Sequence, residues 1–163
     1  MTDSRLMLRA RGVTRAFPVS GGKFWALRGI DADIPAGALT ILKGRSGSGK
    51  TTLLNILSAL DRPTAGEVLF DGQDVARMSE DERTRLRRRR IGFVFQSFNL
   101  FPQYTALRNV TLAKELLSQE RPDFKANRKQ ILEEIQAEGR ELLAKMGLSD
   151  RADHYPSQLS GGQ

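Results

Sequence analysis

The chain has 163 residues, with no cysteine and a single histidine, His154. Without cysteine it can form neither a disulfide nor a thiolate metal site, which fits a reducing compartment such as the cytosol. No apolar stretch approaches the roughly 18 residues that a membrane-spanning helix needs. The opening residues, Met-Thr-Asp-Ser-Arg, also lack the apolar segment of a signal peptide. The sequence therefore predicts a soluble, unexported chain of the size of one domain.

Glycine is concentrated in one motif. Residues Gly44–Thr51 read Gly-Arg-Ser-Gly-Ser-Gly-Lys-Thr, between an apolar run at Ala38–Leu42 and a helix-forming run at Thr51–Leu60. Glycines let consecutive N–H groups curl around a phosphate, and the helix that follows directs its positive end at the same anion. In this pattern Lys50 contacts the β- and γ-phosphates, and the Thr51 hydroxyl binds Mg²⁺. The motif predicts a phosphate-binding loop.

The net charge of +7 is local, because six arginines lie in one eight-residue stretch and seven minus six leaves only +1 for the rest of the chain. These are Arg83, Arg85, Arg87, Arg88, Arg89 and Arg90. A helix explains them: Ser79 and Glu82 predict a capping box, acidic residues fill the first turn, and basic residues fill the last, as the helix dipole prefers. No aromatic residues are interleaved, so we favour a solvated helix end over a nucleic-acid surface.

Strand patterns come first along the chain and helical patterns later. Strands are expected at Leu6–Phe17 with a break near Gly12, and at Phe24–Ile34, Ala38–Leu42, Glu67–Phe70, Gln73–Val75 and Ile91–Phe95, with a loop at Pro18–Lys23 and a hairpin turn at Asp71-Gly72. Beyond Leu107, a 3-4-3-4 spacing predicts a helix with a narrow packing stripe, formed by Leu132, Ile135, Gly139, Leu142 and Met146. This order favours a nucleotide-binding core with an appended helical lobe.

The last five residues, Leu159-Ser160-Gly161-Gly162-Gln163, resemble the signature motif of ATP-binding cassette (ABC) proteins. The resemblance covers nearly the whole chain: the phosphate loop at Gly44–Thr52, the segment Leu60–Gly66, and the run Gly92–Gln96 that ends at a glutamine. The text from Arg89 to Leu100, with Thr105–Val110 behind it, is most similar to the lipoprotein-release and macrolide-export branch.

The resemblance implies an α/β fold: a P-loop NTPase cassette core with an antiparallel β subdomain and an appended α-helical lobe. We expect residues 1–102 to hold the core and the β subdomain, and residues 103–163 to hold the lobe. The resemblance also implies an ATPase subunit that uses ATP and Mg²⁺, pairs with a second copy, and couples ATP binding and hydrolysis to export through a transmembrane permease. Such a subunit lies in the cytoplasm at the inner face of the cell membrane. No nucleic-acid partner is expected.

The resemblance also implies roles for individual residues. Phe17 stacks on adenine, where the alternative is a core aromatic; Gln96 reaches Mg²⁺ and the attacking water, where the alternative is a surface amide. Thr51 and Gln96 are the implied metal ligands. The implied nucleotide contacts of the loop are Gly44, Arg45, Ser46, Gly47, Ser48, Gly49, Lys50, Thr51 and Thr52. The signature residues Leu159, Ser160, Gly161, Gly162 and Gln163 contact the ATP of the partner subunit, with Ser160 and Gly161 at a helix start.

The sequence also departs from the family pattern. The family places an acidic motif and a histidine beyond the signature, and neither lies in these residues. Asp71 only imitates the acidic motif, since it precedes Gly72 in a turn, and His154 comes before the signature and is expected to be exposed. We therefore expect the C-terminal half of the core to be absent and the chain alone to bind ATP without hydrolysing it.

The family fold also places two strands between Ala38–Leu42 and Ile91–Phe95, so these two segments should not pair directly. Three hypotheses remain open. The residues are an excerpt of a transporter ATPase, a stand-alone non-hydrolysing nucleotide-binding or interaction module, or, less favoured, a soluble cassette ATPase that acts on nucleic acid through Arg83–Arg90.

Overall fold

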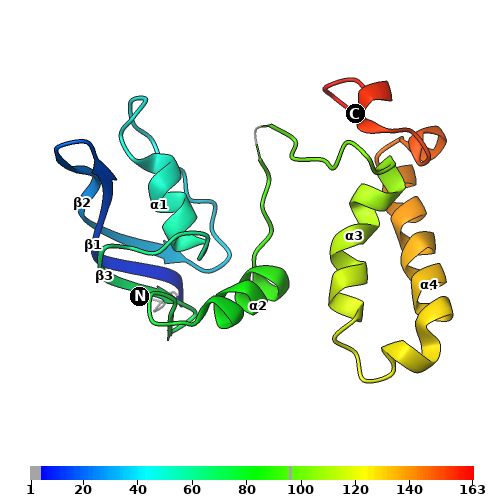
Figure 1. Ribbon diagram of the computed structural model, residues 1–163, viewed down its shortest axis with the longest axis horizontal. Coiled ribbons are helices and arrows are strands. Elements are labelled where there is room, and N and C mark those ends of the chain that lie inside the picture. Colours follow the sequence, from blue (N-terminus) through cyan, green and yellow to red (C-terminus); the bar gives the residue numbers. More distant parts are fainter. Residues whose placement is uncertain (1–4, 96) are drawn as a thin grey trace. The chain divides into compact units, whose positions relative to one another are not determined.

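The computed structural model describes residues 5–95 and 97–163, which form two compact units. The first unit ends at Gly92 and the second begins at Phe93 (Figure 1). The first contains the β-sheet with helices α1 and α2, and the second contains helices α3 and α4. No helix in the described ranges is long and apolar enough to cross a membrane.

The first unit is built on one antiparallel sheet with the strand order β2-β1-β3-β4. Its strands are β1 (Leu6–Val19), β2 (Gly22–Pro35), β3 (Ala65–Phe70) and β4 (Gln73–Asp74). β1 and β2 are joined by a two-residue turn, Ser20-Gly21, so the predicted loop at Pro18–Lys23 is wrong. Pro18 and Lys23 pair across the hairpin because Gly21, at φ 88°, allows the chain to reverse within two residues.

The predicted break in β1 near Gly12 is confirmed. Gly12 has φ 56°, and the register with β2 shifts between Ala10 and Val13, which is a β-bulge. The freed Gly12 N–H donates to the Asp31 carboxylate at 2.6 Å. Gly66 of β3 lies against this bulge, because a Cβ added there would stand 2.6 Å from the Gly12 carbonyl oxygen. β1 and β3 therefore approach closely at a point where neither strand carries a side chain.

The predicted hairpin turn at Asp71-Gly72 is also confirmed, with both residues at positive φ, 47° and 81°. The Asp71 carboxylate accepts hydrogen bonds from Arg5, and from Arg90 at 3.0 Å, and these lower the pKa of Asp71. This carboxylate is thus held in a turn, as expected for a residue that only imitates the acidic motif of the family.

Helix α1 (Lys50–Leu57) packs on the sheet and forms the core of the first unit with it. Its residues Leu53, Ile56 and Leu57 are buried on one side, since positions three and four apart share a helix face. Ile56 belongs to one core cluster with the sheet residues Val13 and Val68, and all three are fully buried. This packing fixes the start of α1 relative to the β1–β2 hairpin.

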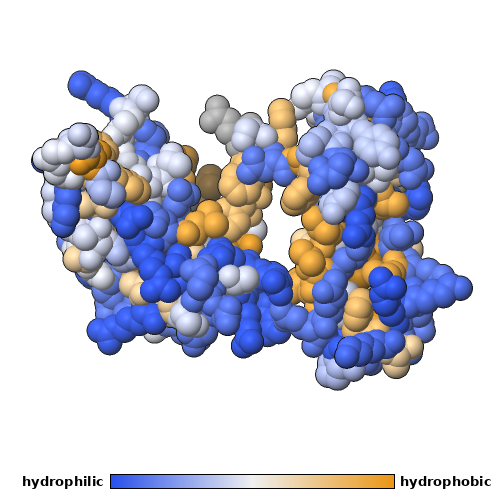
Figure 2. Space-filling model, in the orientation of Figure 1, coloured by the Kyte–Doolittle hydropathy of each residue, from blue (hydrophilic) through white to orange (hydrophobic). Residues whose placement is uncertain are grey.

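Helix α2 (Glu80–Arg90) begins with the predicted capping box. The Ser79 hydroxyl accepts from the Glu82 N–H at 3.3 Å, and the Glu82 carboxylate accepts from the Ser79 N–H at 2.7 Å. These bonds satisfy two N–H groups that the first turn otherwise leaves unpaired. Figure 2 shows the hydrophilic surface along this helix.

The prediction of a solvated arginine run is wrong for two of its members. Arg83 is only 3% exposed, and its guanidinium donates to the Ala59 carbonyl at 2.7 Å. Arg87 donates to the same carbonyl at 2.5 Å and to Glu80 at 3.1 Å. Cations are favoured beside the carbonyls that follow a helix end, and Ala59 follows α1. The run therefore also fastens α2 to the end of α1.

Protonation of Glu82 should weaken the cap of α2. Hydrogen bonds from the Ser79 side chain and then from its N–H hold the pKa of Glu82 below its usual range. Because the folded state has the lower pKa, the stabilisation is complete above the unfolded pKa of about 4.3 and is lost as the pH falls through the folded value. We expect Glu82→Gln to have a lower free energy of unfolding in urea than the wild type at neutral pH, and this difference to shrink towards about pH 3.

Asp81→Asn, in the same turn but outside the capping box, is the control for Glu82→Gln. A deficit that does not change with pH would contradict this.

The second unit is a pair of helices, α3 (Ala106–Ser118) and α4 (Phe124–Lys145), followed by two short 3-10 helices, η1 (Ser149–Arg151) and η2 (Pro156–Gln158). The two long helices lie side by side (Figure 1). α4 carries a packing stripe as predicted, but its members differ: Ile131, Ile135, Gly139 and Leu143 are buried, whereas Leu142 and Met146 are exposed. A Cβ on Gly139 would stand 2.6 Å from Thr111 Cγ2, so glycine permits this close helix contact.

Neither apolar run predicted as an interior strand forms one. Residues 38–45 and 91–95 have no strand structure, and no ladder joins the two runs in the described part of the chain. Leu39 is 90% exposed and Val94 is fully exposed. Figure 2 shows apolar surface open to solvent along the segment that follows α2. A strand needs a neighbour for its N–H and C=O groups, and the four-stranded antiparallel sheet offers these runs none.

Candidate functional site

The glycine-rich segment before α1 has the backbone that its sequence predicts. Gly47 has φ 77° and Gly49 has φ 87°, both in the left-handed region that side chains disfavour. Gly49 is also closely packed, since a Cβ there would stand 2.7 Å from the Ala26 carbonyl oxygen and 2.8 Å from Leu27 Cδ2. Strand β2 is therefore in close contact with the end of the loop.

The start of α1 offers free N–H groups to an anion. The helix begins at Lys50, no side chain caps it, and its first backbone bond runs from Leu53 N–H to the Gly49 carbonyl at 2.8 Å. The N–H groups of the first turn lack partners within the helix, and the dipole adds positive potential at the same place. Such an end binds phosphate without needing any side chain.

The Lys50 ammonium lies over the same loop. It donates to the carbonyls of Gly44 and Arg45, each at 2.8 Å, and approaches the Ser48 hydroxyl at 3.5 Å. These bonds hold a positive charge within the loop and orient it before any ligand arrives. The cation and the free N–H groups of the helix therefore form one anion-attracting region.

A hollow of about 350 Å³ opens at this loop. Its lining consists of Phe17, Phe24, Ala26, Ser46, Gly47, Ser48, Gly49, Lys50, Thr51 and Thr52. Phe17 of β1 thus lines one hollow with the predicted loop residues from Ser46 to Thr52. Gly44 and Arg45 are not among the lining residues, and their carbonyls accept from Lys50.

Two lining residues, Phe24 and Ala26, were missed by the sequence analysis. The signal was available, since a two-residue hairpin turn places Phe24 directly opposite Phe17.

The Phe17 ring also contacts a cationic side chain of its own strand, that of Arg15. The Arg15 guanidinium lies 4.6 Å from the centre of the Phe17 ring, and it donates to the Asp61 carboxylate at 2.8 Å. A guanidinium at this distance is attracted to the ring face. Phe17 is therefore a partly exposed ring beside the hollow with one cationic neighbour, and it is not among the buried core residues.

The predicted metal ligands are described only in part. Thr51 lines the hollow, whereas Gln96 lies outside the described residues. No carboxylate is among the lining residues, and the described ranges contain no group of three or more His, Cys, Asp or Glu side chains arranged to hold a metal ion. The hollow as described thus offers backbone N–H groups, hydroxyls and one ammonium, a set suited to phosphate.

The signature residues Leu159–Gln163 lie in the second unit and form a turn. The Ser160 N–H donates to the Gln163 side chain at 2.9 Å, and the Gln163 N–H donates to the Ser160 carbonyl at 3.0 Å. The expectation that a helix starts at Ser160 stays a prediction, because the described residues from Ser160 to Gln163 form a single turn.

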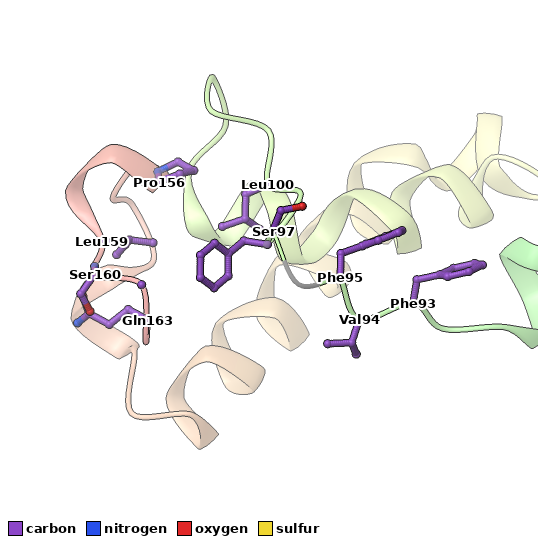
Figure 3. Close-up of a pocket in the computed structure, with 11 residues that line it drawn as sticks. Phe93, Val94, Phe95, Ser97, Leu100, Pro156, Leu159, Ser160 and Gln163 are labelled. Atoms are coloured by element: carbon purple, nitrogen blue, oxygen red, sulfur yellow. The ribbon is translucent and has the colours of Figure 1, made fainter. Parts of the chain in front are cut away.

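A second hollow, of about 570 Å³, lies beside this turn (Figure 3). Leu159, Ser160 and Gln163 line one part of it, and another part is lined mainly by apolar side chains, those of Phe93, Val94, Phe95, Phe98 and Leu100. The rings of Phe93 and Phe95 are stacked, with centres 5.6 Å apart. His154 lies elsewhere in this unit, 3.2 Å from an Arg151 guanidinium nitrogen, so it does not line the hollow.

Comparison with known proteins matches residues 27–163 to the ABC transporter family model. The lipoprotein-releasing system ATP-binding protein LolD of Bacteroides thetaiotaomicron is 43% identical over 157 residues, which cover 96% of this chain and 65% of the relative. The macrolide export ATP-binding/permease protein MacB of Syntrophobacter fumaroxidans is 47% identical over 141 residues, covering 84% of this chain and 18% of the relative.

Among solved structures, the dimeric ATP-binding cassette MJ0796, in a post-hydrolysis state bound to ADP and phosphate, has a TM-score of 0.76 to this chain. It is 38% identical, and the match covers 96% of this chain and 65% of that one. The predicted fold class, a cassette core with an antiparallel β subdomain and a helical lobe, is confirmed by this likeness.

The chain spans about two thirds of the length of the LolD relatives and of the solved cassette that it matches. The family model matches residues 27–163, which include the loop before α1 and the turn at Ser160, and the branch expected from the sequence is the one to which LolD and MacB belong. On these grounds the chain belongs to the ABC transporter family.

Proposed function

We propose that this chain is the nucleotide-binding part of an ABC exporter, which couples ATP binding and hydrolysis to transport through a partner permease. The observation that carries the proposal is the hollow at the start of α1, where Phe17 and the residues from Ser46 to Thr52 line one space. Similarity to LolD and MacB supports a role in lipoprotein release or macrolide export.

In the proposed complex each part of the hollow binds one part of the nucleotide. The N–H groups from Gly47 to Thr51 hold the β-phosphate, Lys50 holds the β- and γ-phosphates, and Phe17 stacks on adenine. The distances support this division, because Lys50 already lies over the loop and Phe17 lines the same space. Gly44, Arg45 and Thr52 complete the proposed loop contacts.

Mg²⁺ is the cofactor proposed to accompany ATP, with Thr51 and Gln96 as its protein ligands. A hydroxyl and an amide carbonyl are oxygen ligands of the hard type that Mg²⁺ prefers, and Thr51 lines the hollow. The ion would neutralise phosphate charge. In this proposal the chain's own residues position the phosphates, and the described lining of the hollow contains no Asp, Glu or His side chain that could take a proton from water.

We further propose that the chain works as a pair. Leu159–Gln163 would contact the ATP held by the second subunit, while the permease places both subunits at the cytoplasmic face of the membrane. We propose residues 1–102 as the nucleotide-binding part and 103–163 as the helical lobe, because α3 at Ala106 is the first helix after α2. A role in nucleic-acid binding is disfavoured, since Arg83 and Arg87 are engaged with Ala59.

The test is a calorimetric titration of the full chain with Mg-ATP, together with a phosphate-release assay on the same preparation. We expect saturable binding at one site and phosphate release at background, because the lining holds phosphates but contains no general base among the described residues. Absence of ATP binding would refute the proposed function. Steady turnover that survives further purification would show instead that another residue activates water.

A further inference from the structure

We propose that Phe24 is a second aromatic contact for the nucleotide base, so that Phe17 and Phe24 together form a two-ring site whose first ring is positioned by Arg15. The inference rests on the proposed function, since it concerns the base of the nucleotide whose phosphates the loop holds.

The hairpin places both rings beside the loop. Phe17 and Phe24 are paired across β1 and β2, and residues directly opposite in an antiparallel pair project to the same side of the sheet. Both line the hollow, whereas Trp25, the next residue, does not. Phe24 is 55% exposed and is not part of the buried core, so its ring is available to a ligand.

Arg15 determines which side of Phe17 remains for a base. Its guanidinium covers one face of the ring at 4.6 Å, and the ion pair with Asp61 at 2.8 Å anchors it there. Asp61 in turn accepts from the Arg62 N–H at 2.7 Å, which fixes the carboxylate just beyond α1. With one face covered, a base has a single face of Phe17 to stack on, and a second aromatic contact must come from elsewhere in the lining.

Phe24 is the only other ring among the described residues that line this hollow. The hairpin contributes Phe17, Phe24 and Ala26 to the lining, and none of these side chains can hydrogen-bond to a base. Recognition by this wall is therefore apolar contact and stacking, which every nucleobase accepts because each has a π-face.

Binding of ATP and of inorganic tripolyphosphate, compared by calorimetry on the full chain, separates base contacts from phosphate contacts. We expect Phe24→Ala to weaken ATP binding at least about fivefold and to leave tripolyphosphate binding unchanged. Phe24→Tyr, which keeps the ring, should bind ATP as the wild type does. Trp25→Ala is the matched control from the same strand. An unchanged ratio of the two affinities in Phe24→Ala, or an equal loss in Trp25→Ala, would overturn the proposal.

Arg15 is tested as a positioning residue with the same pair of ligands. Arg15→Ala should weaken ATP but not tripolyphosphate, and Arg15→Lys should recover part of the loss because an ammonium can still pair with Asp61. If Phe24→Ala fails to fold, Phe24→Leu removes the ring and keeps most of the apolar volume, and the same change in ratio is expected. A wild type that binds neither ligand would refute the proposed function itself, whereas binding of both with no change in ratio refutes only the two-ring site.

Discussion

Replacement of Lys50 by alanine should weaken ATP binding by about 100-fold. A hydrogen bond to a charged group contributes about 1.5–3 kcal/mol, and 1.4 kcal/mol corresponds to a tenfold change in affinity, so the loss of an ammonium that is proposed to contact two phosphates approaches this figure. The loss of affinity should also include a contribution from the loop itself. Lys50 donates to the carbonyls of Gly44 and Arg45 at 2.8 Å, and these two bonds disappear with the lysine.

The matched control is Lys43→Ala. Lys43 is exposed, precedes the loop and does not line the hollow, so this variant loses the same net charge without losing a proposed contact. Thermal melts of both variants should resemble that of the wild type, since Lys50 makes its bonds at an exposed site. Equal ATP affinity in wild type and Lys50→Ala would remove the loop from the proposed site, and an equal loss in Lys43→Ala would reduce the effect to long-range charge.

The second large effect is on stability: Gly66→Ala should lower the free energy of unfolding by about 4 kcal/mol. Gly66 has φ 98°, a conformation that costs an L-residue about 1–3 kcal/mol. Its new Cβ would also stand 2.6 Å from the Gly12 carbonyl oxygen and 2.7 Å from that of Arg11. Both are backbone atoms, so relief requires β1 and β3 to separate, and overpacking of this kind costs about 1–3 kcal/mol more.

Gly72→Ala separates strain from overlap. Gly72 also has positive φ, 81°, but nothing lies within 4 Å of an added Cβ. It should therefore lose only about 1–2 kcal/mol, from strain alone. Urea unfolding of the two variants measures the difference directly. If they lose equal stability, the close approach of Gly66 to the bulge at Gly12 has no energetic consequence and the argument from backbone overlap fails.

Local sequence determined the features whose partners lie a few residues apart. The turn at Asp71-Gly72 formed because both residues tolerate positive φ, and the capping box formed because Ser79 and Glu82 are one helical turn apart. The glycine-rich loop before α1 has the same origin, since Gly47 and Gly49 allow the backbone that the motif needs. The resemblance to ABC proteins, carried by residue order alone, likewise held over residues 27–163.

Other features depended on partners far along the chain. The sequence alone could not show that Arg83 and Arg87 would share the Ala59 carbonyl. Arg83 lies 24 positions from Ala59 along the chain, and Arg87 lies 28 positions from it. In α4 the buried residue is Leu143, whereas Leu142 was predicted, because packing against α3 decides which face of the helix is covered. Each of these contacts depends on which surface a neighbouring element covers, and helical spacing by itself does not specify that.

The candidate site divides in the same way. The sequence by itself determined the loop from Gly44 to Thr52, because phosphate-binding geometry needs glycine, lysine and a hydroxyl in a fixed local order. Only the tertiary structure decided that Phe24 joins Phe17 at that loop and that Arg15 covers one face of the Phe17 ring. A short hairpin turn and the packing of α1 on the sheet bring these residues together, and the burial of apolar surface at Val13, Ile56 and Val68 holds that packing in place.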